Sequence, residues 1–153
     1  MAQEPIFEGT LSWGGHPAGK PFTYDTYDRS TRLEFVGGAG IDASAPAQFK
    51  GDDARANPET LMLGSLMQCH FLTFMAVAAK SGAPVAEYSD RAEGRLAIKD
   101  GKMRYVEVTL HPRVRFADPA HAEKLATLHA KAHANCFMSN SVNFTVKVEP
   151  DLG

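Results

Sequence analysis

The amino-acid sequence predicts an α+β fold in which helices pack on one face of antiparallel β-sheet. Three observations support this prediction. Residues 60–79 carry no charge and lie between helix-capping residues. Residues 91–116 contain an Asp-Gly pair between two strand-like runs. Short strand-like segments separated by Gly and Pro precede residue 40. The predicted order along the chain is strands, a long helix, a hairpin, a second helix and a last strand. This order is typical of the fold class.

The N-terminal part of the chain predicts an antiparallel start. Residues 7–15, 21–29 and 31–38 are strand candidates, and residues 41–56 are expected to form a loop that leads into the long helix.

The long helix has clear start and stop signals. Asn57 is a good N-cap, Pro58 suits the first helical position, and Gly82 can end the helix. Its apolar side chains point in nearly every direction, so we expect it to be buried in a core or a subunit interface. Its length matches a membrane span, but Gln68 and His70 would place polar groups at the centre of the bilayer. We therefore expect a packing helix and no membrane.

The C-terminal half predicts a hairpin, a helix and a strand. Asp100-Gly101 is the mark of a tight turn, and apolar residues alternate with polar ones over 106–116. Asp118 caps a second helix over 119–135, and an alternating run from Val142 predicts the last strand.

Length and composition limit the class of protein. A chain of 153 residues without a linker or repeat predicts a single domain over 1–153. The net charge is −2 and the basic residues are scattered, which argues against a nucleic-acid partner. The N-terminus lacks the features of a signal peptide, so we expect a cytoplasmic protein. Two cysteines in that reducing compartment are expected to be buried free thiols or catalytic groups.

Three arrangements of cysteine and histidine residues are candidates for redox chemistry, metal binding or nucleophilic catalysis. Cys69 and Cys136, if the fold brings them together, can pass through a sulfenic acid to a disulfide. His129, His133 and Cys136, with Cys69-His70 from the long helix, form a possible four-ligand zinc site. A Cys69–His70 nucleophile and base pair is disfavoured, because adjacent helical residues point about 100° apart.

One pattern is more specific than these. "NPETLMLGSLMQC", in which Glu59 lies ten positions before Cys69, is followed much later by "CFMSNSVNFTVKVE". The combination resembles the OsmC/Ohr family of osmotically inducible and organic hydroperoxide resistance proteins. The likeness covers almost the whole chain, from "GTLSWGG" to the last strand.

The resemblance implies a thiol-dependent peroxidase that reduces organic hydroperoxides, and sometimes hydrogen peroxide, without a cofactor or metal. It implies an intertwined homodimer with long central helices and a dithiol reductant. Cys69 would be the peroxidatic cysteine and Cys136 the resolving one. Glu59 would belong to an Arg-Glu pair that organises the thiolate, with Arg29 as the favoured arginine and Arg32 as the alternative.

The electrostatics of a buried thiolate are consistent with an arginine beside Cys69. A thiolate in apolar surroundings needs a nearby cation, and an arginine does not lose its proton. Ten helical residues span about 15 Å, so Glu59 does not reach Cys69 along its own helix. Either a long arginine from the N-terminal strands reaches between them, or Glu59 comes from the second subunit of an antiparallel helix pair. We take this constraint as a hypothesis that favours a dimer. The alternative functions are a noncatalytic small-molecule or protein-binding module, and the His/Cys zinc site described above.

Overall fold

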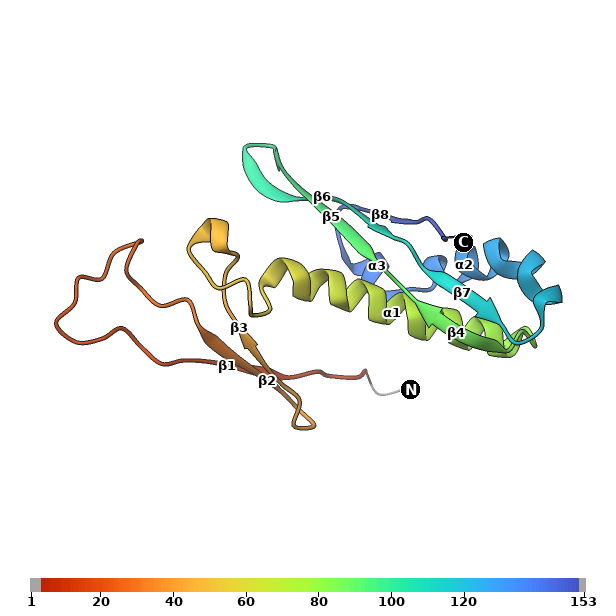
Figure 1. Ribbon diagram of the computed structural model, residues 1–153, viewed down its shortest axis with the longest axis horizontal. Coiled ribbons are helices and arrows are strands. Elements are labelled where there is room, and N and C mark those ends of the chain that lie inside the picture. Colours follow the sequence, from red (N-terminus) through yellow and green to blue (C-terminus); the bar gives the residue numbers. More distant parts are fainter. Residues whose placement is uncertain (1–3, 152–153) are drawn as a thin grey trace. The chain divides into compact units, whose positions relative to one another are not determined.

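The computed structural model of the protein describes residues 4–151, and the chain forms two compact units. The first unit extends to Leu61 and the second begins at Met62. Figure 1 shows the order of the elements along the chain. Helices and antiparallel sheets are both present, so the α+β prediction is confirmed.

The first unit contains one antiparallel sheet in the order β1-β2-β3. Its strands are β1 (Gly9–Trp13), β2 (Thr31–Phe35) and β3 (Gly40–Ala43). The sequence prediction of β3 as loop is wrong, because these residues pair with β2. The prediction of a strand over 21–29 is also wrong. Thr23 and Thr26 hydrogen-bond to each other there and close a turn.

A short 3-10 helix, η1 (Ala47–Phe49), precedes the long helix α1 (Pro58–Lys80). The predicted capping of α1 is confirmed. Oδ1 of Asn57 accepts a hydrogen bond from the backbone N–H of Thr60 at 2.9 Å. At the other end Gly82 adopts a φ of 60°, and the N–H of Ala83 donates to the carbonyl of Ala78. By length and apolar composition alone, α1 would be able to cross a membrane.

The second unit contains two sheets. In one, β4 (Val85–Ser89) pairs antiparallel with β7 (Arg113–Phe116). In the other, β5 (Ala92–Lys99) and β6 (Lys102–Leu110) form the predicted hairpin, and both residues of its Asp100-Gly101 turn have positive φ.

The last strand, β8 (Thr145–Val148), lies parallel to β6, in contrast to the antiparallel pairing of the other strands. It reaches this position after three helical segments, which allows a parallel return.

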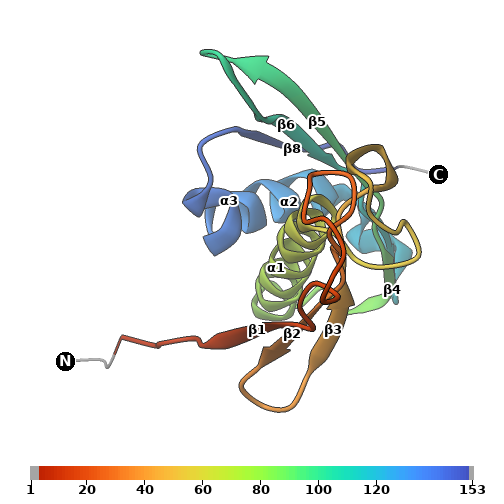
Figure 2. The same ribbon diagram turned by 90° about the vertical axis from the view of Figure 1, so that its left-hand side faces the viewer.

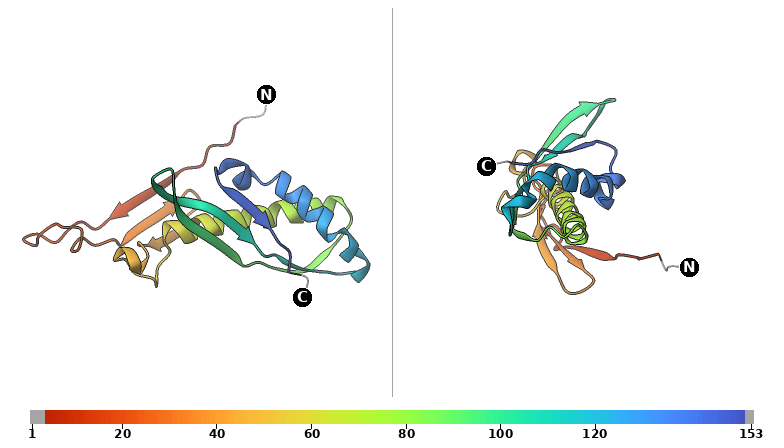
Figure 3. Two further views of the ribbon diagram at one scale, coloured as in Figure 1. Left: turned by 90° about the horizontal axis from the view of Figure 1, so that it is seen from above. Right: turned by 90° about the vertical axis from the view of Figure 1, so that its right-hand side faces the viewer.

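The second helical region is less regular than the sequence predicts. Asp118 caps a 3-10 segment, η2 (Pro119–Lys124), and the α-helical part, α2 (Leu125–Ala134), is shorter than the expected 119–135. A five-residue helix, α3 (Phe137–Ser141), follows directly. Figure 3 shows α2 beside the C-terminal half of α1.

The core of the second unit consists of two apolar clusters. One contains Phe74 of α1, with residues of α2 and β7, and the other contains Leu66 of α1 with residues of β6 and β8. His70 lies between Leu66 and Phe74 on the same buried stripe of α1, so a polar residue separates the clusters. Figure 2 shows α1 nearly end-on, with the sheet of β5, β6 and β8 to one side.

Candidate functional site

The two cysteines meet in the second unit. Cys69 lies near the middle of α1, and Cys136 precedes the first residue of α3. They are separated by 67 positions in the sequence, yet they are 3.3 Å apart in the fold, and both are free thiols. A disulfide has an S–S length of about 2.0 Å, so a small movement suffices to join them.

The surroundings of the two thiols differ. Cys136 is completely buried, whereas Cys69 is only partly buried. Burial raises the pKa of the Cys136 thiol, and the neighbouring Cys69 raises it further, against the lowering effect of hydrogen bonds from Ser139. The backbone N–H of Met138 in α3 donates to Sγ of Cys69 at 3.5 Å. The more accessible sulfur therefore has a donor beside it, and the enclosed sulfur is held as a thiol.

A buried histidine pair joins α1 to α2. Nε2 of His70 and Nδ1 of His129 are 3.0 Å apart, with the two rings stacked at an interplanar angle of 7°. Both side chains are buried. Burial is the main reason that the pKa of each histidine is lowered to about 4. His133 lowers the pKa of His70 further, and His70 does the same to His129. Both rings are therefore neutral at pH 7, with one donating the hydrogen bond and the other accepting it.

This arrangement gives no support to the alternative zinc site. The residues that the structure describes contain no group of three or more His, Cys, Asp or Glu side chains able to hold a metal ion. Asn135 is the C-cap of α2, so His129, His133 and Cys136 do not share one continuous helix. His129 instead uses its Nδ1 to bond His70.

Sequence reasoning missed the contact between the two histidines. The available signal was the position of His70, four residues from Leu66 and four from Phe74 on the buried stripe of α1.

Arg29 and Glu59 belong to the first unit, where both line a cavity of about 730 Å³. Most of the other lining side chains are apolar or aromatic, among them Trp13, Phe22 and Phe49. Arg29 follows the turn at residues 23–26, and Glu59 occupies the first turn of α1. An apolar cavity with a few charged groups is the usual form of a small-molecule site.

Arg32, the alternative arginine, has different neighbours. It lies on β2, where its Nη1 is 3.1 Å from Oδ1 of Asp42, and its Nε is 3.8 Å from Oε1 of Glu34. These ion pairs are exposed, and they engage Arg32 with two carboxylates of its own sheet.

Comparison with known proteins identifies the family. The family model described as OsmC-like protein matches residues 51–151. The chain therefore belongs to the OsmC-like protein family, and the resemblance noted in the sequence is confirmed.

Individual relatives agree with this result. An OsmC-like protein of unknown function from Vibrio cholerae O1 biovar eltor is 32% identical, with a TM-score of 0.87 over 97% of this chain and 100% of that one. An organic hydroperoxide resistance protein from Elizabethkingia anophelis is 22% identical, with a TM-score of 0.74 over the full length of both chains. The uncharacterized protein YmaD of Bacillus subtilis is 24% identical in an alignment of 109 residues that covers 69% of this chain and 73% of YmaD.

Proposed function

We propose that this protein is a thiol-dependent peroxidase that reduces organic hydroperoxides through Cys69 and Cys136. The main support is the approach of the two cysteines to 3.3 Å within one unit. Family membership adds to this support, because structural neighbours include proteins named for organic hydroperoxide resistance.

The proposed reaction has three balanced steps. The Cys69 thiolate attacks the outer oxygen of the hydroperoxide, the O–O bond breaks, and the alkoxide leaves and takes up a proton. Cys69 becomes a sulfenic acid. The sulfur of Cys136 then attacks that of Cys69, which forms the disulfide and releases water. An external dithiol supplies two electrons and two protons, restoring both thiols and becoming a disulfide itself.

The surroundings of the thiols support this division of roles. Peroxide must reach the attacking sulfur, and Cys69 is the more exposed of the two. The N–H of Met138 donates to Sγ of Cys69 at 3.5 Å, so a hydrogen-bond donor lies beside the sulfur that would attack the peroxide. The raised pKa of Cys136 suits a resolving cysteine that reacts only after the first step.

We propose Arg29 as the cation of the site and Glu59 as the group that orients it. An arginine keeps its charge in apolar surroundings, and its donors can stabilise the leaving alkoxide. Both residues line the same apolar cavity, which suits the organic part of a hydroperoxide. Arg29 is favoured over Arg32 because the latter is engaged by Asp42 and Glu34.

We further propose that the protein acts as a homodimer in the cytoplasm. Leu72 of α1 and Phe137 of α3 are 56% and 76% exposed, and both belong to the unit that holds the cysteines. Large apolar side chains that stay exposed are a feature of surfaces that bind a partner. A second copy of the chain would cover them, in agreement with the dimer that the family resemblance implies.

A noncatalytic small-molecule binding module is the second candidate, and the apolar cavity of the first unit is the observation that favours it. Binding alone requires neither thiol, so the two functions differ in their dependence on the cysteines.

The deciding experiment measures consumption of an organic hydroperoxide with a dithiol reductant. We expect Cys69→Ser to reduce the rate to the uncatalysed background, because a serine hydroxyl is not ionised at neutral pH. We expect Cys136→Ser to react once, forming a sulfenic acid at Cys69 that a dimedone-type probe traps, and then to turn over poorly. Full activity in Cys69→Ser would overturn the role of Cys69. A folded wild-type protein that consumes hydroperoxide no faster than the background would overturn the peroxidase and leave the binding module.

A further inference from the structure

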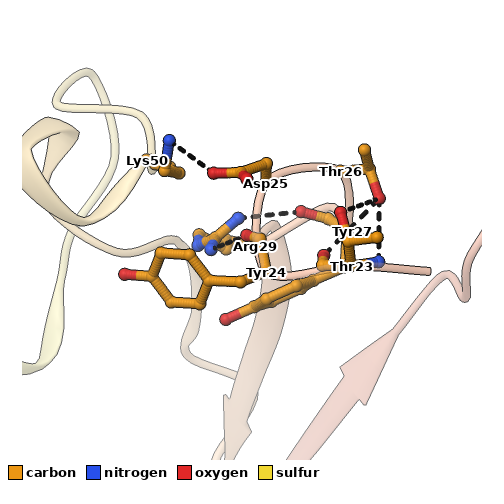
Figure 4. A network of polar contacts seen from close by, with 7 residues as sticks. All are labelled: Thr23, Tyr24, Asp25, Thr26, Tyr27, Arg29 and Lys50. Atoms are coloured by element: carbon orange, nitrogen blue, oxygen red, sulfur yellow. Dashed lines mark hydrogen bonds and ion pairs between the residues drawn. The ribbon is translucent and has the colours of Figure 1, made fainter. Parts of the chain in front are cut away.

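The Arg29 guanidinium is enclosed by its own loop. The carbon Cζ lies 3.8 Å from the centroid of the Tyr27 ring and 4.9 Å from that of Tyr24. Nη1 donates to the carbonyl oxygen of Tyr27 at 3.0 Å, and Nη2 donates to that of Tyr24 at 2.6 Å. Figure 4 shows the guanidinium against both tyrosines. Each tyrosine therefore contacts Arg29 through its ring and through its backbone.

The loop is anchored to other elements of the first unit. Nζ of Lys50, just after η1, lies 2.6 Å from Oδ1 of Asp25 (Figure 4). On the other side, Nε1 of Trp13 in β1 donates to the carbonyl of Asp28 at 2.9 Å. These contacts fix the backbone on both sides of Tyr27, so the two carbonyls that hold Arg29 have defined positions.

The contacts around Arg29 reduce the conformational entropy that its side chain would lose when a substrate binds. A free arginine side chain has many rotamers, and ordering it when a substrate binds lowers affinity and rate. Contacts that hold the guanidinium beforehand remove that cost. A guanidinium has five N–H donors, so two bonds to carbonyls leave it able to contact a substrate.

We propose that Tyr27, assisted by Tyr24, is a positioning residue that holds the Arg29 guanidinium at the wall of the cavity before the hydroperoxide binds. This inference rests on the proposed function, in which Arg29 acts on the thiolate and the peroxide. Tyr27 has the larger role because its ring is closer and it is less exposed than Tyr24. The aromatic face, rather than the phenol oxygen, makes the contact.

The test compares Tyr27→Leu, which removes the ring, with Tyr27→Phe, which keeps it. The first readout is the NMR order parameter of the Arg29 Nε–H bond, which does not depend on activity. We expect this order parameter to be clearly lower than in the wild type in Tyr27→Leu and slightly lower in Tyr24→Leu. In Tyr27→Phe it should equal the wild-type value. An unchanged order parameter in Tyr27→Leu would overturn the proposal.

The second readout is kcat/KM for an organic hydroperoxide. We expect Tyr27→Leu to lower it by about fivefold, the factor that corresponds to a partly exposed cation–π contact, with Tyr27→Phe close to wild type. In an Arg29→Ala background, Tyr27→Leu should have no further effect. An equal loss in both backgrounds would show a general structural effect and contradict the positioning role. An inactive wild type would overturn the peroxidase function, while the order parameter would still decide whether Tyr27 holds Arg29.

Discussion

His70 and His129 form the polar contact that joins α1 to α2. Each ring has one nitrogen in the shared hydrogen bond, while the second nitrogen, Nδ1 of His70 and Nε2 of His129, is buried without a partner within the described chain. A proton added to either ring would place a charge between the two apolar clusters. His133 acts electrostatically on His70, and the ring of Phe74 packs against that of His129 with centroids 4.3 Å apart.

The histidine pair predicts acid sensitivity of the fold. The pKa of both rings is about 4 in the folded protein, below the ordinary value of 6.5, so the unfolded chain binds more protons between these limits. Stability is therefore fully present above pH 6.5 and is lost as the pH falls toward 4. We expect a loss on the order of 3 kcal/mol for each ring, measured by urea unfolding across this range.

The matched control replaces both histidines with glutamine, which forms hydrogen bonds but does not titrate. The stability of His70→Gln/His129→Gln should depend much less on pH between 6.5 and 4. An unchanged pH dependence in this double variant would mean that other groups cause the acid sensitivity.

Among the elements, α1 follows its sequence most closely. Its caps are local: Asn57 and Thr60 contact each other across one turn, and Gly82 supplies the left-handed backbone that the C-terminus requires. The loop at 21–29 was predicted as a strand because its Phe, Tyr and Thr residues favour sheets. Its actual conformation depends on Lys50 and Trp13, which are distant in sequence and invisible to a local pattern.

The N-cap of α1 predicts a measurable contribution to stability. Asn57→Ala removes the acceptor for the Thr60 N–H, and we expect a loss of about 1 kcal/mol in the free energy of unfolding. Asn57→Asp keeps an acceptor at the same place and should retain most of that stability. The measurement is urea denaturation at pH 7, and equal stability of the alanine variant and the wild type would refute the role of the cap.

For the molecule as a whole, the sequence predicted the fold class well and the site only with help from the family pattern. Nothing in composition or periodicity brings Cys69 to Cys136, because their contact depends on how α2 and α3 return to α1. The roles of Arg29 and Glu59 remain predictions from the resemblance. The histidine pair was missed because His70 and His129 are 59 positions apart and their contact is tertiary.

The exposed apolar residues of the second unit predict self-association. Light scattering coupled to size-exclusion chromatography should give a mass twice the 16.6 kDa of one chain. Phe137→Asp places a charge on an apolar side chain that is 76% exposed, and it should shift the mass toward the monomer. Phe137→Leu keeps the apolar character and should remain dimeric. A wild-type protein that is monomeric at micromolar concentration would contradict the proposed homodimer.

The closeness of the two cysteines has a mechanical consequence. Going from 3.3 Å to a bonded length of about 2.0 Å changes the sulfur–sulfur separation by only about 1.3 Å. A shift of that size lies within the reach of rotamer adjustments and a slight displacement of α3, without unwinding either neighbouring helix. Reduced and oxidised forms would then be nearly superimposable, and a crystal grown in one state should survive conversion to the other.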